Sequence, residues 1–224
     1  MATYHIHRCI GRDGTERPER VADVLREIGA DVVALQEVAH RPGTPDNVLA
    51  YLADSINAEA IEGTTLRDER GNYGNALLTR VTPESVRRWD ISVPRREPRG
   101  ALDVVLAVND SAARVVTTHL GLRAGERRYQ IRRILSLLEA GSADITMVMG
   151  DFNEWYLWGR PLRWLNRTFE PMPSPATFPS HRPFLALDRM WVRPRHRLIS
   201  LTAHRSAQAR NASDHLPLVA ELAL

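Results

Sequence analysis

The chain has 224 residues, enough for a sizeable buried core, and 43% hydrophobic with 25% charged residues is typical of a globular protein. All 30 basic residues are arginines, so Schiff-base enzymes, pyridoxal-phosphate enzymes and Walker A loops, which need a lysine, are excluded. The single cysteine, Cys9, excludes an intramolecular disulfide, a redox disulfide and a cysteine-rich zinc site.

The net charge of +3 is compatible with a polyanionic partner, because guanidinium binds phosphate through two hydrogen bonds at once. An arginine bias of a GC-rich genome is the simpler explanation of the same charge. No apolar run approaches the roughly 20 residues that span a bilayer, and the N-terminus lacks the basic and apolar regions of a secretory signal. We therefore expect a cytoplasmic protein without a transmembrane segment, with a monomer favoured.

The hydrophobic pattern predicts short strands alternating with amphipathic helices. Helices are expected over residues 18–28, 46–57 and 124–139, and strands over 31–37, 75–79, 101–108, 114–119, 145–149, 186–192 and 216–222. Several strands follow one another without a helix between them, which favours two packed sheets over one doubly wound sheet. No stretch resembles an interdomain linker, so we expect a single α/β domain over residues 1–224.

Polar side chains recur at the ends of these strands. The motifs are Gln36-Glu37, Thr118-His119-Leu120, Gly150-Asp151-Phe152-Asn153, Leu187-Asp188-Arg189 and Ser213-Asp214-His215. Carboxylates that follow apolar runs are costly to bury unless they are paired or bound to a cation. Converging carboxylate and amide oxygens suit Mg²⁺ or Mn²⁺, with a substrate phosphate completing the coordination shell, and histidines transfer protons near neutral pH.

Each motif taken alone has a simpler explanation. Glu37 could cap a helix or pair with an arginine, and Asp151 and Asn153 could be turn formers. His119 could be a packed histidine, and Asp188 could pair with its neighbour on the surface. Together and in this order, however, the motifs resemble the endonuclease/exonuclease/phosphatase superfamily, and the resemblance runs from about residue 3 to the C-terminus.

The resemblance implies a four-layer α/β/β/α sandwich with two packed, mostly antiparallel mixed sheets. It also implies hydrolysis of phosphoester bonds with Mg²⁺ or Mn²⁺ as the cofactor. The implied metal ligands are Glu37 and Asp214, whereas Asp151 and Asn153 position and activate the attacking water or help to hold metal and phosphate. His215 contacts the scissile phosphate.

The remaining implied roles concern proton transfer and substrate binding. Asp188 holds the imidazole of His215, and His119 protonates the leaving oxygen or binds phosphate. Asn75 faces the site, and Arg99, which precedes a strand, binds phosphate; an exposed loop arginine is an equally good interpretation of Arg99.

One position departs from the family pattern. The family usually has an asparagine in the first strand, where this chain reads Thr3-Tyr4-His5-Ile6-His7. His5 is thus expected as a metal ligand, and because imidazole prefers softer cations than Mg²⁺ does, it would shift preference towards manganese or zinc, or weaken activity.

The sequence leaves the substrate open. Nucleic acid, either DNA or RNA, is the leading phosphodiester substrate because of the His119 motif and the basic charge. A phospholipid or another small phosphoester is the nearest alternative. The aromatic residues after Asp151 could stack on bases, form a lipid-facing lip or, more simply, pack a short helix; they are Trp155, Tyr156, Trp158 and Trp164. A catalytically weak binding protein is the third interpretation, motivated by His5.

Overall fold

The computed structural model describes residues 1–109, 111–139, 141 and 143–223. The strands are β1 (Ala2–His5), β2 (Val32–His40), β3 (Glu59–Asp68), β4 (Gly71–Thr79), β5 (Pro83–Asp90), β6 (Gly100–Val108), β7 (Ser111–His119), β8 (Ile145–Asp151), β9 (Asp188–Arg193), β10 (Leu198–Ala203) and β11 (Leu218–Leu222). The helices are α1 (Pro18–Ile28), α2 (Val48–Asp54), α3 (Ala124–Leu138), α4 (Arg160–Phe169) and α5 (Ala209–Ala212), with 3₁₀ turns η1 (His7–Cys9) and η2 (Arg195–Arg197). None of the helices in these ranges has the length and apolarity that a bilayer crossing needs.

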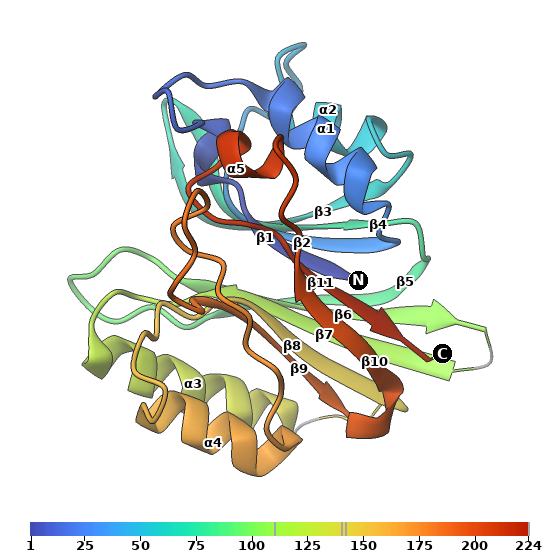
Figure 1. Ribbon diagram of the computed structural model, residues 1–224, viewed down its shortest axis with the longest axis vertical. Coiled ribbons are helices and arrows are strands. Elements are labelled where there is room, and N and C mark those ends of the chain that lie inside the picture. The colour runs from blue at the N-terminus through green and yellow to red at the C-terminus, as the bar shows by residue number, and fades with distance from the viewer. Residues whose placement is uncertain (110, 140, 142, 224) are drawn as a thin grey trace.

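Two mixed sheets pack face to face, and helices cover both outer faces (Figure 1). The six-stranded sheet has the order β10-β11-β1-β2-β4-β3, and the five-stranded sheet has the order β5-β6-β7-β8-β9. The pairs β1–β2 and β7–β8 are parallel, and the other ladders are antiparallel. Helices α1, α2 and α5 lie over the first sheet and α3 and α4 over the second (Figure 1), so the predicted four-layer sandwich is confirmed.

Strand β2 explains why the sequence has a nearly continuous apolar run there. Val33 and Leu35 belong to the apolar cluster under α1 and α2, whereas Val32 and Ala34 belong to the cluster between the two sheets. A strand buried on both faces must be apolar at successive positions rather than alternate ones. This strand carries Glu37 to the rim of the sandwich.

The observed elements match the expected ones, with differences at their ends and at the edges of the sheets. Helix α2 is shorter than the expected 46–57, because the side chain of Asn47 caps its N-terminus by accepting hydrogen bonds from the N–H groups of Leu49 and Ala50. Strands β3, β5 and β10 and helix α4 were not predicted. The first three are edge strands.

Candidate active site

Three neighbouring strand ends of the five-stranded sheet place His119, Asp151 and Asp188 in one row. Asp151 on β8 is in register with His119 on β7 and with Asp188 on β9. The Nε2 atom of His119 lies 3.4 Å from Oδ2 of Asp151. Gly150 makes this approach possible, because its φ is +140° and a Cβ atom there would collide with the carbonyl oxygen of Thr118.

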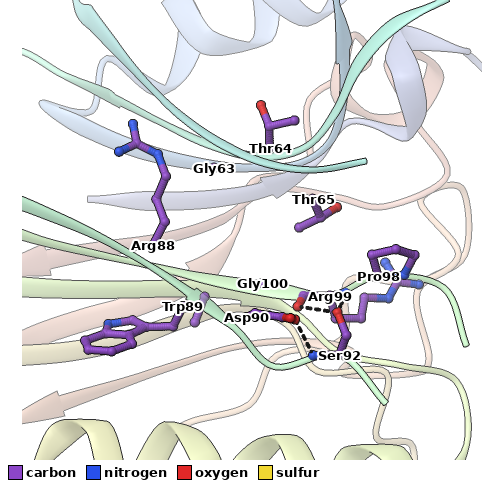
Figure 2. A pocket seen from close by; sticks show the side chains of 11 residues that line it. Gly63, Thr64, Thr65, Arg88, Trp89, Asp90, Ser92, Pro98, Arg99 and Gly100 are labelled. Atoms are coloured by element: carbon purple, nitrogen blue, oxygen red, sulfur yellow. Dashed lines mark hydrogen bonds between the residues drawn. The ribbon is translucent and has the colours of Figure 1, made fainter. Parts of the chain in front are cut away.

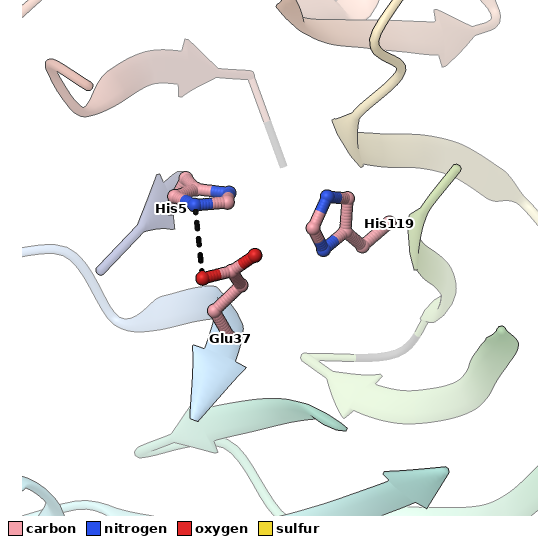
Figure 3. A group of neighbouring side chains, drawn as sticks. All are labelled: His5, Glu37 and His119. Atoms are coloured by element: carbon pink, nitrogen blue, oxygen red, sulfur yellow. Dashed lines mark ion pairs between the residues drawn. The ribbon is translucent and has the colours of Figure 1, made fainter. Parts of the chain in front are cut away.

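The six-stranded sheet contributes His5 and Glu37. Glu37 lies in a β-bulge between Leu35 and Val38 and has a φ of +57°, which is uncommon for a residue other than glycine. The bulge turns the carboxylate towards His5, whose Nε2 lies 3.6 Å from Glu37 Oε2 and whose Nδ1 lies 3.3 Å from Asp151 Oδ2. His5 therefore lies where the two sheets meet, and Figure 3 shows it with Glu37 and His119 around one space.

His215 and Asp188 form a buried pair. Oδ2 of Asp188 lies 2.7 Å from Nδ1 of His215 and accepts a second hydrogen bond, of 2.6 Å, from the hydroxyl of Thr177. Since a carboxylate only accepts, the imidazole proton is on Nδ1, which leaves Nε2 as the free acceptor. Burial opposes protonation of His215, but the charge of Asp188 outweighs it and raises the pKa of His215. The His215 ring stacks on His5 with ring centroids 4.3 Å apart.

Arg99 determines the tautomer of His119. Nη1 of Arg99 lies 2.9 Å from Nδ1 of His119. Because guanidinium has no acceptor, Nδ1 must be unprotonated and the proton of the neutral ring is on Nε2, towards Asp151. Burial, reinforced by the charge of Arg99, lowers the pKa of His119 to about 3. His119 is therefore a neutral imidazole that can donate a hydrogen bond from Nε2.

The donor set around His5 fits a divalent cation. His5, Glu37 and His119 offer ligand atoms that all lie within 4.8 Å of one another, and so do His5, Asp151 and His215. Nδ1 of His5 is buried and makes no aligned hydrogen bond, although Oδ2 of Asp151 lies 3.3 Å away, so its lone pair in the neutral ring is available to a cation. The set is rich in imidazole nitrogen, and such sets suit Mn²⁺ or Zn²⁺ better than Mg²⁺.

The charged forms of His5, Glu37 and Asp151 stabilise one another. Burial opposes ionisation of Glu37 and Asp151, but the close imidazole of His5 outweighs it, so the pKa of each carboxyl is well below its usual value. Burial likewise opposes protonation of His5, but Asp151 and Glu37 raise the pKa of His5 well above its usual value. A proton on His5 thus stands in for the positive charge that a cation would supply.

Asn153 and Asp214, two other expected site residues, belong to neither group of possible metal ligands in the described part of the chain. Asn153 is buried; its backbone N–H donates to Oδ1 of Asp151 at 2.8 Å and its side-chain amide donates to the carbonyl of Leu120 at 2.9 Å. Asp214 lies apart from both metal-ligand groups found in the described part of the chain. Its carboxylate is 41% exposed and lies 3.9 Å from Nδ1 of His7.

Asn75 and Arg99, the expected substrate-binding residues, both line a narrow hollow beside Glu37 and His119. Arg99 also lines a larger cavity of about 390 Å³ between the edges of the two sheets (Figure 2). Arg88 lies on the other side of this cavity, and Nε of Arg99 is buried without a hydrogen-bond partner. The hollow beside Glu37 and His119 and the larger cavity thus share Arg99.

Three residues that complete the site were not assigned from the sequence. Tyr73 lines the same hollow as Glu37 and helps to lower the pKa of its carboxyl, the hydroxyl of Thr177 donates to Asp188, and the ring of Phe178 lies 4.8 Å from that of His215. Tyr73 lies two residues before Asn75, and Thr177 and Phe178 lie in the stretch that leads to Asp188. Their positions in the sequence indicate that they lie near the site, but do not indicate which site residue each one contacts.

A double-sheet sandwich with carboxylates and imidazoles gathered at one rim is the architecture of a phosphoesterase class of hydrolases. Residues 9–215 match the model of the Endonuclease/Exonuclease/phosphatase family, and the chain belongs to this family. Its relatives include the uncharacterized protein YbhP of Escherichia coli K12, 33% identical over 220 residues that cover 90% of this chain and 87% of that protein.

Solved structures show the same fold at lower identity. A mannosyl-6-phosphatase from Bacteroides thetaiotaomicron is 15% identical with a TM-score of 0.78, over 100% of this chain and 98% of that one. The human Nocturnin catalytic domain with a bound sulfate anion is 18% identical with a TM-score of 0.72, over 98% of this chain and 92% of that one. The predicted superfamily is confirmed.

Proposed function

We propose that the protein is a divalent-metal-dependent hydrolase of phosphodiester bonds that works as one domain over residues 1–224. The observation that carries the proposal is the position of His5. It lies between Glu37 of one sheet and Asp151 of the other, at distances of 3.6 and 3.3 Å, with His119 and His215 against it. Carboxylates this close together can bind a cation, and the imidazoles beside them can contact a phosphate.

The cation would be held by Glu37, His5 and Asp151, with Asp214 as an outer ligand, and Mn²⁺ or Mg²⁺ is the proposed cofactor. When bound, it supplies positive charge that neutralises the developing charge on the phosphate. Asp151 and Asn153 orient the attacking water, since a carboxylate oxygen and an amide oxygen can each accept a hydrogen bond from it. Nε2 of His215 faces the scissile phosphate with its partner nitrogen held by Asp188, and Nε2–H of His119 donates to the leaving oxygen.

Nucleic acid is the first candidate substrate. Arg99 beside His119, with Arg88 across the cavity, offers guanidinium donors to a phosphate next to the one that is cleaved. A phospholipid is the second candidate, favoured by the exposed apolar residues that follow Asp151. A phosphomonoester is a further candidate, since a relative in fold is a mannosyl-6-phosphatase.

The test is hydrolysis of bis(p-nitrophenyl) phosphate with Mn²⁺ or Mg²⁺. Glu37→Ala should lower the rate at least about 100-fold, because it removes the carboxylate of the metal site. Glu69→Ala, which removes an exposed carboxylate elsewhere, is the matched control. Equal rates for wild type and Glu37→Ala would leave a weakly active binding protein instead. A panel of DNA, RNA, phospholipid and sugar phosphate then identifies the substrate class.

A further inference from the structure

Consecutive large apolar side chains are exposed directly after the strand that carries Asp151. Trp155, Tyr156, Leu157 and Trp158 are 42, 53, 68 and 73% exposed and belong to no helix or strand, and Leu122, before α3, is 62% exposed. We call Leu122 and residues 155–158 the apolar lip. Runs of exposed apolar residues are avoided on soluble surfaces unless they serve an interaction.

The lip is fixed by buried contacts. Arg127, which is fully buried, donates from Nε and Nη2 to Glu154 at 3.1 and 3.2 Å and from Nη1 to the carbonyl oxygen of Leu122. Its guanidinium also lies 4.8 Å above the ring of Trp155. The two parts of the lip are thus joined through one side chain, and their exposure is a property of the fold.

The charges beside the lip are positive. Arg128 and Arg160 line a cavity of about 300 Å³ together with Tyr156 and Trp158. The neighbouring carboxylates, Glu126 and Glu154, are buried and paired with Arg96 and Arg127. A partner that fits this surface is therefore anionic as well as apolar.

We propose that the apolar lip docks on a bilayer that contains anionic phospholipid. Tryptophan and tyrosine favour the membrane–water interface, leucine partitions into the acyl region, and arginine pairs with anionic headgroups. Single-stranded nucleic acid would also use tryptophan and arginine, but Leu122 and Leu157 contribute nothing to base stacking, and Arg127 covers one face of Trp155. Docking would bring the end of β8, which lies four residues before Trp155 in the chain, towards the bilayer.

Vesicle co-sedimentation tests the docking. Wild type should bind vesicles of mixed phosphatidylglycerol and phosphatidylcholine, and pure phosphatidylcholine vesicles more weakly. Leu157→Asp with Trp158→Asp should weaken binding at least about tenfold, equivalent to about 1.4 kcal/mol. Ile199→Asp, at a residue 60% exposed on β10, is the matched control and should bind as wild type. Arg160→Gln should weaken binding to the anionic vesicles, whereas Arg205→Gln, near α5, should not.

Two results would overturn the proposal: no binding of wild type to anionic vesicles, or equal binding of the lip variant. A lip variant that loses affinity for a single-stranded oligonucleotide but not for vesicles would assign the surface to nucleic acid instead. The inference goes beyond the proposed hydrolysis and is measured separately from it. Glu37→Ala should keep full vesicle binding, and the lip variant should keep wild-type hydrolysis of soluble bis(p-nitrophenyl) phosphate, which also shows that it folds.

Discussion

Asp188 is a positioning residue at the scale of a single side chain. It is buried and reaches the proposed chemistry only through Nδ1 of His215. Asp188→Asn keeps the size but removes the charge that stabilises the imidazolium and fixes its tautomer, so we expect kcat to fall by roughly 100- to 10,000-fold. The Kd for Mn²⁺, measured by calorimetry, should change much less. Thr177→Val, which removes the other hydrogen bond to the same carboxylate, should cost less turnover, and normal kcat for Asp188→Asn would contradict the role.

The protonation state of His119 is a second prediction at this scale. In the metal-free protein, burial and Arg99 lower its pKa to about 3, so ¹⁵N NMR should find the neutral Nε2–H tautomer at pH 5. Between the ordinary value near 6.5 and pH 3 the unfolded chain binds the proton and the folded protein does not. This histidine's contribution to stability is therefore complete above pH 6.5 and is lost as the pH falls. Arg99→Leu should raise the pKa of His119, and an imidazolium at pH 5 in wild type would exclude the assignment.

His5 should control the choice of metal. An asparagine oxygen is a harder ligand than an imidazole nitrogen, and it does not take up the proton that Asp151 and Glu37 favour on His5. His5→Asn should therefore raise the Mg²⁺-supported rate relative to the Mn²⁺-supported rate severalfold. The measurement is the ratio of the two rates on one soluble phosphodiester. An unchanged ratio would mean that His5 does not set metal preference.

At the scale of elements, the strands that are buried in the sandwich were easier to predict from the sequence than the strands that are exposed at sheet edges. The central strand β2 is buried on both faces at Val32 to Leu35 and was predicted from its apolar run. Strand β5 has no buried residue along Pro83–Asp90, and β3 and β10 also lie at sheet edges, so solvent allows polar side chains that break the alternation. Helix α4 did carry a signal, with Pro161 in its first turn and Leu162, Leu165 and Phe169 buried at helical spacing, but it lies in a tryptophan- and proline-rich stretch.

Arg114 joins strand β7 to the end of helix α3. It donates to both oxygens of Asp103 at 2.8 and 2.7 Å and to the carbonyls of Leu137, Leu138 and Gly141, and the arginine and the aspartate are both buried. Arg114→Leu leaves the buried Asp103 carboxylate with the indole N–H of Trp89 but without the guanidinium, and it removes the three hydrogen bonds to the carbonyls at the helix end. The free energy of unfolding in urea should fall by about 3–5 kcal/mol. The double variant with Asp103→Leu should recover part of this loss, and a loss below about 1 kcal/mol for Arg114→Leu alone would show that water replaces the pair.

At the scale of the whole molecule, the ordered motifs named residues that the fold brings together, such as His5, Glu37 and Asp151, but not the contacts between them. The sequence places Glu37 and Asp151 more than a hundred residues apart, and their approach depends on the bulge at Glu37 and on the packing of two sheets. The stacking of His5 on His215 and the bond from Arg99 to His119 arise from the same packing. Asp214 differs from these residues. It lies next to His215 in the same motif, but its carboxylate is 41% exposed.

A cation bound at His5 would lie between the two sheets, because His5 forms one group of possible ligands with Glu37 of its own sheet and another with Asp151 of the facing sheet. Since only the folded protein brings them together, a metal at 100 times its Kd should stabilise the fold by about 2.7 kcal/mol. In a chain of this length that corresponds to an increase in Tm of about 5–10 °C, measured with Mn²⁺ and reversed by a chelator. Glu37→Gln should lose most of the shift, whereas Glu69→Gln should retain it. A shift of equal size in Glu37→Gln would place the bound metal elsewhere, and no shift at saturating Mn²⁺ would leave the two sheets without a shared cation.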